Sequence, residues 1–360
     1  MPPLGMYAEL QGLLSRADRG LGRLDGSIQT LPDADLFVFM YVRKEAVLSS
    51  QIEGTQSSLD DVLAAEAQIL SPDAPRDVDE VLNYVKAMNH GLERLSTLPV
   101  SVRLIREIHE HLLTGVRGAE RSPGEIRRSQ NWIGPGGASL AEATFIPPPP
   151  DDLPQALSDW ERFLHADDPM PILVKIGLAH AQFETIHPFL DGNGRVGRLL
   201  IALLLTERQV LHRPVLYLSH YFKQHRARYY DALQAIRDEG DWEGWMAFFL
   251  EAVADVAEEA TATARHIVEV RERHRALIQR ELGRATASGL KVLESLYLRP
   301  IVSVNDVLEL TGTSFAAAND LVKRLAALGI VGEITGYARN RRFRYDEYVR
   351  IFSESRDEQA

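Results

Sequence analysis

The stretch HPFLDGNGRVGR, residues 187–198, decides how the rest of the chain is interpreted. It contains GNGRVG, which satisfies the G-x-G-x-x-G pattern of dinucleotide-binding folds. In those folds the glycines follow a buried strand, and an acidic residue lies about 20 positions further on. Here the preceding segment carries Val174, Leu178 and Ala181 at helical spacing, and the downstream VLYLSHY offers no suitable acid. The context therefore argues against a dinucleotide site.

A phosphate site explains the same residues better. Gly192, Asn193 and Gly194 can take the tight conformations that point successive backbone N–H groups to one side, which makes a nest for anions. An apolar helix is expected from Arg195 onward, so the nest would lie at the positive end of a helix dipole. Arg195 and Arg198 are neighbours on its first turn, where basic side chains are unfavourable unless an anion compensates them. We expect that anion to be a polyphosphate.

Two residues just before the nest supply the remaining chemistry. Asp191 is a hard oxygen ligand of the kind that binds the Mg²⁺ accompanying polyphosphates. His187 has an ordinary pKa of about 6.5, which suits a proton acceptor near neutral pH. Each of these residues taken singly is more often structural. However, packing alone does not readily explain why a base, a metal ligand, an anion nest and a pair of cations follow one another within twelve residues. The cluster predicts an active site.

Composition narrows the class of protein. The 360 residues are 45% hydrophobic, enough for two or three folded units. The absence of cysteine excludes disulfides, thiolate nucleophiles and cysteine-bound zinc, and no histidine spacing of the HExxH type suggests a zinc enzyme. The N-terminus has no basic region ahead of an apolar core, and the apolar run 199–205 is too short to span a bilayer. We expect a cytoplasmic protein that binds no membrane.

Most of the chain is predicted to be helical, with one pair of strands in its middle. Residues 125–133 and 143–147 are expected to form a hairpin around the Gly-rich loop 134–139, ended by the prolines at 147–150. Asp33 is expected to cap a helix that contains Phe37 and Met40. Residues 251–282 lack glycine and proline and predict a long helix that joins two domains.

The C-terminal segment predicts a winged helix-turn-helix module. Two short helices separated by Thr311-Gly312 are followed by a strand, a Gly-centred turn and a second strand. The net charge of −11 argues against nucleic-acid binding by the whole surface, but residues 316–345 contain six basic and two acidic residues. Binding of DNA through this module and formation of a homodimer through it both remain open.

The central stretch resembles the signature of the Fic family, His-Pro-Phe-x-(Asp/Glu)-Gly-Asn-Gly-Arg-x-x-Arg, and every specified position is present. SPGEIRRSQNWIG followed by FIPPPP is similar to the flap of that family, and the likeness extends to about residue 250. It implies a mainly α fold: a Fic-type helical core with a short β-hairpin flap, followed by the small winged-helix-like domain. The expected divisions are an N-terminal helical region (1–100), a catalytic core with flap (101–252), a linker helix (253–284) and the winged-helix-like domain (285–360).

The resemblance implies transfer of AMP from ATP to a Ser, Thr or Tyr hydroxyl of a protein target, which includes the chain itself. His187 would deprotonate the hydroxyl, and Asp191 would hold Mg²⁺ against the phosphates. Gly192–Gly194 would stabilise the developing charge, and Arg198 would bind the γ-phosphate with Arg195 assisting. The flap would hold the target backbone as an added strand.

A second motif lies far upstream. In SSQIEG, residues 49–54, Glu53 is expected near a helix C-terminus, where a carboxylate is unfavourable without a cationic partner. Ser49, Glu53 and Gly54 resemble the inhibitory motif Ser-x-x-x-Glu-Gly of the Fic family. The likeness implies a Glu53–Arg198 pair in the γ-phosphate position, with Ser49 anchoring the inhibitory helix. It also implies that Glu53 positions water for removal of AMP from a modified target.

Two alternatives stay open. The chain could be a DNA-binding regulator whose Fic portion senses nucleotide, or a Fic transferase that uses another nucleotide donor. Tyr229 and Tyr230 are candidates for stacking on the base of the donor, although paired tyrosines also occur in protein cores.

Overall fold

The computed structural model describes residues 5–29, 34–134, 139–337 and 339–353. Asp33, expected as a helix cap, and the tip of the Gly-rich loop at 135–138 lie outside these ranges. No described helix is both long enough and apolar enough to cross a bilayer. The helices are α1 (Ala8–Gln29), α2 (Ala34–Ile52), α3 (Leu59–Glu66), α4 (Val78–Arg94), α5 (Val102–Leu113), α6 (Leu153–Leu164), α7 (Ile172–Ile186), α8 (Asn193–Glu207), α9 (Ser219–Gln224), α10 (Arg226–Glu239), α11 (Trp242–Glu281), α12 (Thr286–Leu296), α13 (Val304–Thr311), α14 (Phe315–Ala327) and α15 (Asp346–Ser353). The strands are β1 (Ile301–Ser303), β2 (Gly332–Glu333) and β3 (Arg342–Arg344).

The chain divides into two compact units, and each is built from separate segments. The first unit comprises residues 1–26, 45–57 and 76–259, and the second comprises residues 27–44, 58–75 and 260–360. Helix α2 therefore contributes its beginning to the second unit and its end to the first. The predicted divisions at residues 100, 252 and 284 follow the chain and stay predictions.

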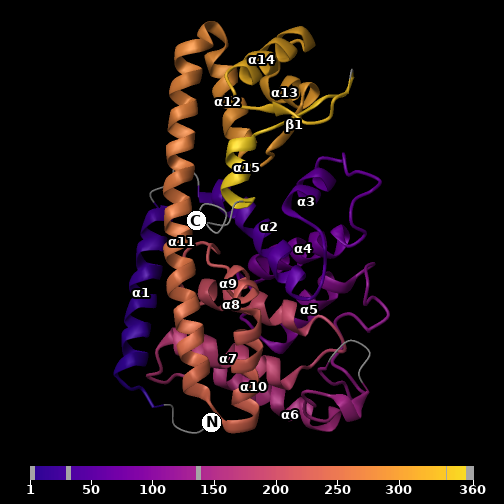
Figure 1. Ribbon diagram of the computed structural model, residues 1–360, viewed down its shortest axis with the longest axis vertical. Helices are drawn as coiled ribbons and strands as arrows, with labels where there is room; N and C mark the ends of the chain where they lie inside the picture. Colours follow the sequence, from indigo (N-terminus) through magenta and orange to yellow (C-terminus); the bar gives the residue numbers. More distant parts are fainter. Residues whose placement is uncertain (1–4, 30–33, 135–138, 338, 354–360) are drawn as a thin grey trace. The chain divides into compact units, whose positions relative to one another are not determined.

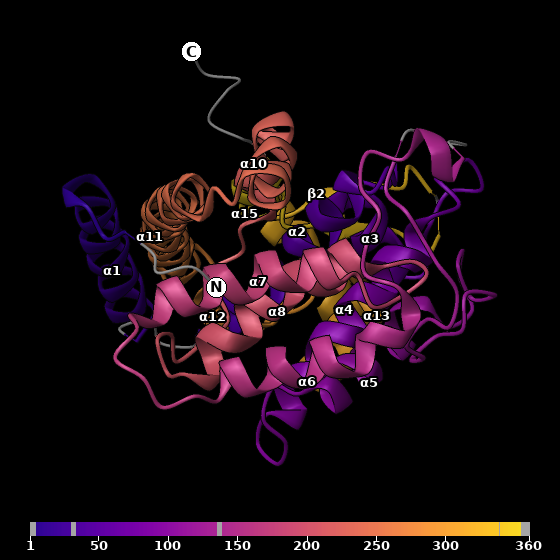
Figure 2. The same cartoon turned by 90° about the horizontal axis from the view of Figure 1, so that it is seen from below.

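Helices α7 and α8 form the centre of the first unit. They pack against each other, α7 also contacts α6 and α10, and α8 also contacts α4 and α5 (Figure 2). Both helices are buried on nearly every side, from Leu173 to Ile186 and from Asn193 to Leu205. A helix that is apolar on all sides is stable only when other helices cover it on all sides.

The long helix α11 begins at Trp242, earlier than the predicted residue 251. Gly240 ends α10 in a left-handed conformation with φ +72°, and the Asp241 side chain accepts a hydrogen bond of 2.9 Å from the N–H of Gly244. Side-chain capping by Asp starts a helix at the next residue. Alongside the first-unit part of α11 lies α1, where Gly20 allows close approach to Ala254 and Ala257 (Figure 1).

The predicted hairpin is much shorter than expected. Within the described residues it consists of one antiparallel bridge, between Ile133 and Phe145, and residues 140–142 form a 3₁₀ turn. The described remainder of the segment forms no further bridge, because several of its polar side chains bond to backbone carbonyls. Arg127 donates to the backbone of the loop after α7, and Asn131 donates to the carbonyl of Phe189 at 2.9 Å.

The C-terminal part of the second unit has the order predicted for a winged helix-turn-helix, with one added strand. Helices α12, α13 and α14 (Figure 1) are followed by β2 and β3, and the sheet has the antiparallel order β1-β3-β2. The three-residue β1 was not predicted, because so short a strand shows no alternation in sequence. Ser303 caps α13 with a capping box, and Gly312 ends that helix at φ +66°.

One glycine in the central layer offers a direct test of this packing. A Cβ on Gly177 would lie 2.8 Å from Cδ1 of Phe249 and 3.0 Å from Cε of Met246, both fully buried. Gly177→Ala should therefore lower the free energy of unfolding by about 1–3 kcal/mol in urea denaturation. The control Gly22→Ala, where a Cβ meets nothing within 4 Å, should raise it by up to about 1 kcal/mol. Equal stabilities of the two variants would contradict the close packing of α7 on α11.

Candidate active site

The residues of HPFLDGNGRVGR form the connection between α7 and α8. His187 ends α7 in the left-handed region, with φ +49° and ψ +61°. Gly192 takes φ +77°, a conformation that glycine adopts without strain. Helix α8 then begins at Asn193, two residues earlier than the expected Arg195. The first backbone N–H groups of a helix have no acceptor within that helix. In α8 these groups belong to the glycine-rich segment itself, so they are placed to bind an anion.

The loop is held by contacts that fix its shape. The Asn193 side chain accepts from the N–H of Phe189 and donates to its carbonyl, each at 2.8 Å. His109 accepts from the N–H of Gly124 through Nδ1, so Nε2 donates to the carbonyl of Asp191 at 3.0 Å. Burial lowers the pKa of His109 to about 4, which keeps it neutral. The Asn193 side chain therefore builds the loop, and only its backbone N–H is available to a phosphate.

The imidazole of His187 is neutral, with a pKa below the ordinary value of about 6.5 that was expected from the sequence. Burial, aided by the positive charge of Arg237, lowers the pKa of His187 to about 4, so the ring is neutral at pH 7. Among the described residues its Nδ1 is buried without a hydrogen-bond partner. The positive φ of His187 is held in place by Arg127, whose Nε donates to the carbonyl of His187 at 2.9 Å and whose N–H donates to Pro188 at 2.9 Å.

The predicted pair between Glu53 and Arg198 is present. The guanidinium of Arg198 donates from Nη2 to Oε1 of Glu53 at 2.7 Å. Its Nε donates to Oγ of Ser49 at 2.8 Å, and Nη2 also donates to the Ser49 carbonyl at 3.0 Å. Burial alone would raise the pKa of Glu53, but the charge of Arg198 outweighs burial and the net pKa is lowered. Glu53 is therefore a carboxylate bound to a buried cation.

One glycine makes room for this pair, and two others shape the chain around it. A Cβ on Gly194 would overlap Oε1 of Glu53 and would lie 2.9 Å from Nη1 of Arg198. Gly54 turns the chain after α2 with φ +97°, so the Glu53 side chain leaves the end of the helix beside α8. A Cβ on Gly197 would overlap Oε1 of Glu184 on α7. The glycines of the motif thus serve close approach as much as backbone conformation.

Arg195 lies between two carboxylates, those of Asp191 in the motif loop and Glu80 on α4. The Arg195 side chain is 2% exposed, with Nη1 3.4 Å from Oε2 of Glu80 and Nη2 3.5 Å from Oδ1 of Asp191. The Asp191 side chain is 40% exposed, so its carboxylate is accessible. No cluster of three or more metal-ligating side chains occurs among the described residues. One accessible carboxylate nevertheless fits Mg²⁺, which binds through one or two carboxylates together with substrate phosphates.

The two tyrosines expected near the base lie in different surroundings. Tyr229 is 1% exposed, its hydroxyl lies 2.9 Å from Nε2 of His180, and its ring stacks on Phe222. The prediction that Tyr229 stacks on a nucleotide base is therefore corrected, because this ring belongs to the core. Tyr230 is 36% exposed and carries the guanidinium of Arg226 over its ring, so it remains the candidate.

Two buried carboxyls near Arg198 were missed. Glu45 lies one turn before Ser49 on α2, is 2% exposed, and accepts from Oγ of Ser219 at 2.5 Å and from the hydroxyl of Tyr84 at 3.1 Å. Burial raises the pKa of Glu45 to about 7 and that of Glu184 to about 7. The four-residue spacing of Glu45, Ser49 and Glu53, which places them on one helix face, was a usable signal.

Comparison with known proteins gives two family matches. The Fic/DOC family N-terminal model matches residues 11–93, and the Fic/DOC family model matches residues 99–205. A protein adenylyltransferase Fic from Culex quinquefasciatus is 34% identical over 213 residues, covering 58% of this chain and 37% of that protein. The Drosophila melanogaster protein of the same name is 31% identical over 176 residues, covering 48% and 32%. The chain thus spans about a third of the length of the curated relatives it matches.

Solved structures show the same fold. A Fic family protein from Desulfovibrio desulfuricans G20 is 21% identical and has a TM-score of 0.63, covering 96% of this chain and 98% of that one. Fic-1 from C. elegans is 22% identical with a TM-score of 0.52, covering 72% and 74%. The first likeness extends through both units of the chain.

The buried carboxyl on α2 predicts a pH effect. Because the pKa of Glu45 is raised from 4.5 to about 7, folding favours its protonated form, and its contribution to stability is lost as pH rises through this range. Glu45→Gln keeps a neutral group, so its stability relative to wild type should increase from about pH 5 to about pH 8, by about 2–3 kcal/mol. Thermal unfolding at several pH values measures this. A difference that does not change with pH, or an equal gain in the exposed control Glu258→Gln, would exclude a buried neutral Glu45.

Proposed function

Because the chain belongs to the Fic/DOC family, we propose that it is a protein adenylyltransferase that transfers AMP from ATP to a hydroxyl of a protein target and that is inhibited by its own Glu53. The curated relatives carry the name protein adenylyltransferase, which supports the reaction class. The observation that carries the inhibition is the 2.7 Å contact between Glu53 and Arg198.

In the proposed reaction His187 acts as the general base. Its neutral imidazole would take the proton of the target hydroxyl as the hydroxyl oxygen attacks the α-phosphorus of ATP. The bond from the α-phosphorus to its bridging oxygen would break, and pyrophosphate would leave. Arg127 and the loop contacts of Asn193 supply positioning, since they fix the backbone on both sides of the motif.

The first turn of α8 would bind the phosphates. The N–H groups of this turn and its positive helix end suit the charge that develops on the phosphates, whereas the N–H of the preceding Gly192 already donates to Oδ1 of Asp191 at 2.6 Å. Mg²⁺ bound at Asp191 would neutralise charge on the phosphates, and the neighbouring Arg195 would keep the Asp191 carboxylate in position. Arg195 was expected to assist in binding the γ-phosphate. Because its side chain is buried and lies beside Asp191, we propose that it holds the Asp191 carboxylate in place. Arg198 is the residue left to bind the γ-phosphate.

The same geometry explains the inhibition. Arg198 has Nε bound to Ser49 and Nη2 bound to Ser49 and Glu53, so a γ-phosphate would have to displace both. The carboxylate of Glu53 would also repel it. Glu53, held at the end of α2, therefore prevents the productive arrangement of ATP. A second expected activity is removal of AMP from a modified target, with the Glu53 carboxylate positioning the attacking water.

Release of the inhibition is testable by intact mass. Glu53→Gly removes a charge-assisted contact worth about 1.5–3 kcal/mol, which corresponds to a gain in rate of roughly 10- to 100-fold. We expect Glu53→Gly incubated with ATP and Mg²⁺ to gain AMP, on itself or on added lysate proteins, faster than wild type by this factor. Ser49→Ala, which removes one contact to Arg198 and leaves Glu53, should give a smaller gain.

The control is Glu53→Gly combined with His187→Ala, which should lose about 10²- to 10⁴-fold in rate. Incubation with GTP, CTP or UTP in place of ATP tests for another donor. Labelling that persists without His187 would refute the general base, and labelling no faster than wild type would refute the inhibition. Preference for another nucleotide would correct the donor alone.

The proposal of DNA binding finds little support in the winged module. Of the six basic residues between 316 and 345, Arg344 is paired with Asp60 and Asp346, and Arg342 makes one long contact of 3.4 Å with Asp306. The exposed start of α14 carries Phe315, which is 58% exposed, followed by the exposed Ala316 and Ala317. These features suit protein contact, such as a homodimer, better than a phosphate backbone.

We therefore expect the full chain not to shift fragmented genomic DNA in gels, even at about 50 mM salt, where electrostatic binding is strongest. Light scattering over a concentration series would measure dimerisation on the same samples. A gel shift that weakens steeply with salt would restore the DNA-binding regulator.

A further inference from the structure

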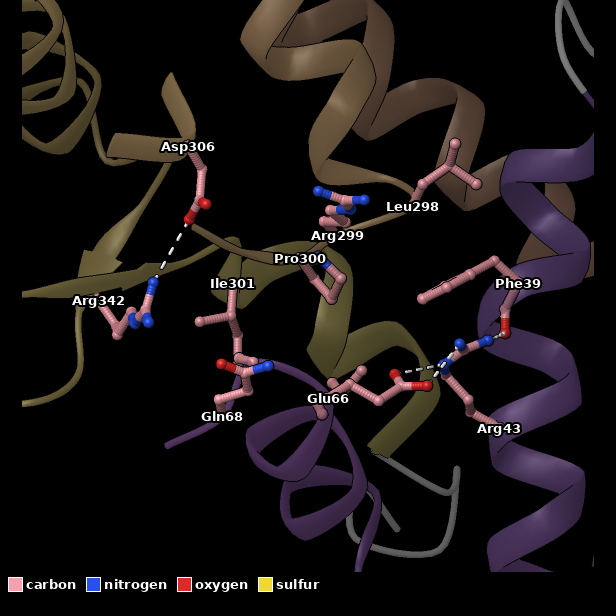
Figure 3. A pocket seen from close by; sticks show the side chains of 12 residues that line it. Phe39, Arg43, Glu66, Gln68, Leu298, Arg299, Pro300, Ile301, Asp306 and Arg342 are labelled. Atoms are coloured by element: carbon pink, nitrogen blue, oxygen red, sulfur yellow. Dashed lines mark hydrogen bonds and ion pairs between the residues drawn. The ribbon is translucent and has the colours of Figure 1, made fainter. Parts of the chain in front are cut away.

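A cavity of about 520 Å³ lies within the second unit, away from the residues of the proposed reaction. Its walls come from α2, from α3, and from the segment that enters β1 (Figure 3). The volume is in the range of pockets that hold small molecules, about 300–1,000 Å³. Three arginines and two acidic residues line it, which leaves one net positive charge: Arg43, Arg299, Arg342, Glu66 and Asp306.

One wall is rigid. Arg43 on α2 donates from Nε and Nη2 to the two carboxylate oxygens of Glu66, each at 2.7 Å, and from Nη1 to the carbonyl of Phe39 at 2.9 Å. Its guanidinium also lies 3.3 Å from the centre of the Phe39 ring. Arg43 is therefore fully engaged, and it fixes α2 against α3 at the edge of the cavity.

The other wall has unused donors. Arg342 on β3 makes one long contact, 3.4 Å from Nη1 to Oδ2 of Asp306, and its Nε is buried without a partner among the described residues. Arg299 is exposed, and no hydrogen bond or ion pair of its side chain is found in the described part of the chain. Figure 3 shows Arg299, Pro300 and Ile301 along the segment that enters β1, with Arg342 beyond Ile301 and with Phe39 and Arg43 on the opposite wall, on α2. These two arginines, next to the apolar side chains of Pro300 and Ile301, suit a ligand that has an anionic group at one end and an apolar body.

We propose that this cavity binds a small organic anion, with a carboxylate or phosphoryl group at Arg299 and Arg342 and a compact apolar body against Pro300 and Ile301. The unsatisfied Nε of Arg342 would gain an acceptor, and a ligand whose apolar body also reaches Phe39 across the cavity would join α2 to the β1 segment. Both acidic residues of the lining already face an arginine, Glu66 at Arg43 and Asp306 at Arg342, so Arg299 is the cation with no acidic partner among the described residues.

The site is connected to the proposed inhibition through α2, and this second step rests on the proposed function. Phe39 and Arg43 contact the cavity, and Glu53 follows Arg43 by ten residues, about 15 Å along a helix. A ligand that binds the conformation with α2 in place stabilises that conformation by its binding energy. Occupancy should therefore hold the end of α2, and with it Glu53, on Arg198.

Binding is tested by calorimetry on the full chain with phenyl phosphate and benzoate as probes and benzamide as the neutral control. At least one anion should bind saturably with a Kd below about 1 mM, and benzamide should not. Arg299→Gln, an exposed position whose loss should not affect folding, should weaken binding about tenfold or more. Arg284→Gln, an exposed arginine of the same unit outside the cavity, should leave it unchanged. Absence of binding by both anions, or equal binding by Arg299→Gln, overturns the site.

Coupling is tested by amide hydrogen exchange of peptides from residues 45–57, with and without the bound probe. Exchange should slow on binding in wild type and not in Arg299→Gln. Unchanged exchange at saturating probe overturns the coupling and leaves the site. Neither readout depends on catalysis, so a failure of nucleotide transfer would be recognised separately.

Discussion

The guanidinium of Arg198 is the group on which the geometry of the first unit depends. It is 3% exposed, and it binds Ser49 twice and Glu53 once, so that one side chain of α8 fixes the end of α2. Removing one partner of a buried ion pair commonly costs about 3–5 kcal/mol, although the partly exposed Glu53 should cost less. The charge of Arg198 also acts on Glu45 and Glu184. Glu53, which contacts this cation directly, has a lowered pKa, whereas burial raises the pKa of Glu45 and of Glu184 to about 7.

The glycines of the motif answer three separate demands. Gly192 provides a positive φ before α8, Gly194 leaves room for the Glu53–Arg198 pair, and Gly197 leaves room for Glu184. The same spacing in a dinucleotide-binding fold serves a pyrophosphate turn after a strand. In both folds the glycines allow another group to come close to the backbone. Here those groups are the side chains of Glu53, Arg198 and Glu184, and in a dinucleotide-binding fold the group is a pyrophosphate.

Local patterns predicted most of the fold, and they identified the motif loop at residues 187–198 as the candidate site. The helical period of residues 172–186, the glycine-rich start of α8 and the order of the winged module were readable, because each depends on neighbours in sequence. The pairing of Glu53 with Arg198, 145 residues apart, was accessible only through a family resemblance. Arg127 and His109 were missed because nothing in their local sequence marks a long-range bond to a backbone carbonyl. The flap was predicted with too much strand, since alternation does not reveal that its polar groups bond to the motif loop.

The central claim is that Glu53 occupies the place of the γ-phosphate beside Arg198. Calorimetric titration of ATP and of AMP into wild type and Glu53→Gly tests it most directly, because only ATP carries that phosphate. The account predicts that Glu53→Gly binds ATP about tenfold more tightly or better, a difference of at least about 1.4 kcal/mol, while the affinity for AMP is unchanged. Equal affinities of the two proteins for ATP, or an equal gain for AMP, would contradict it.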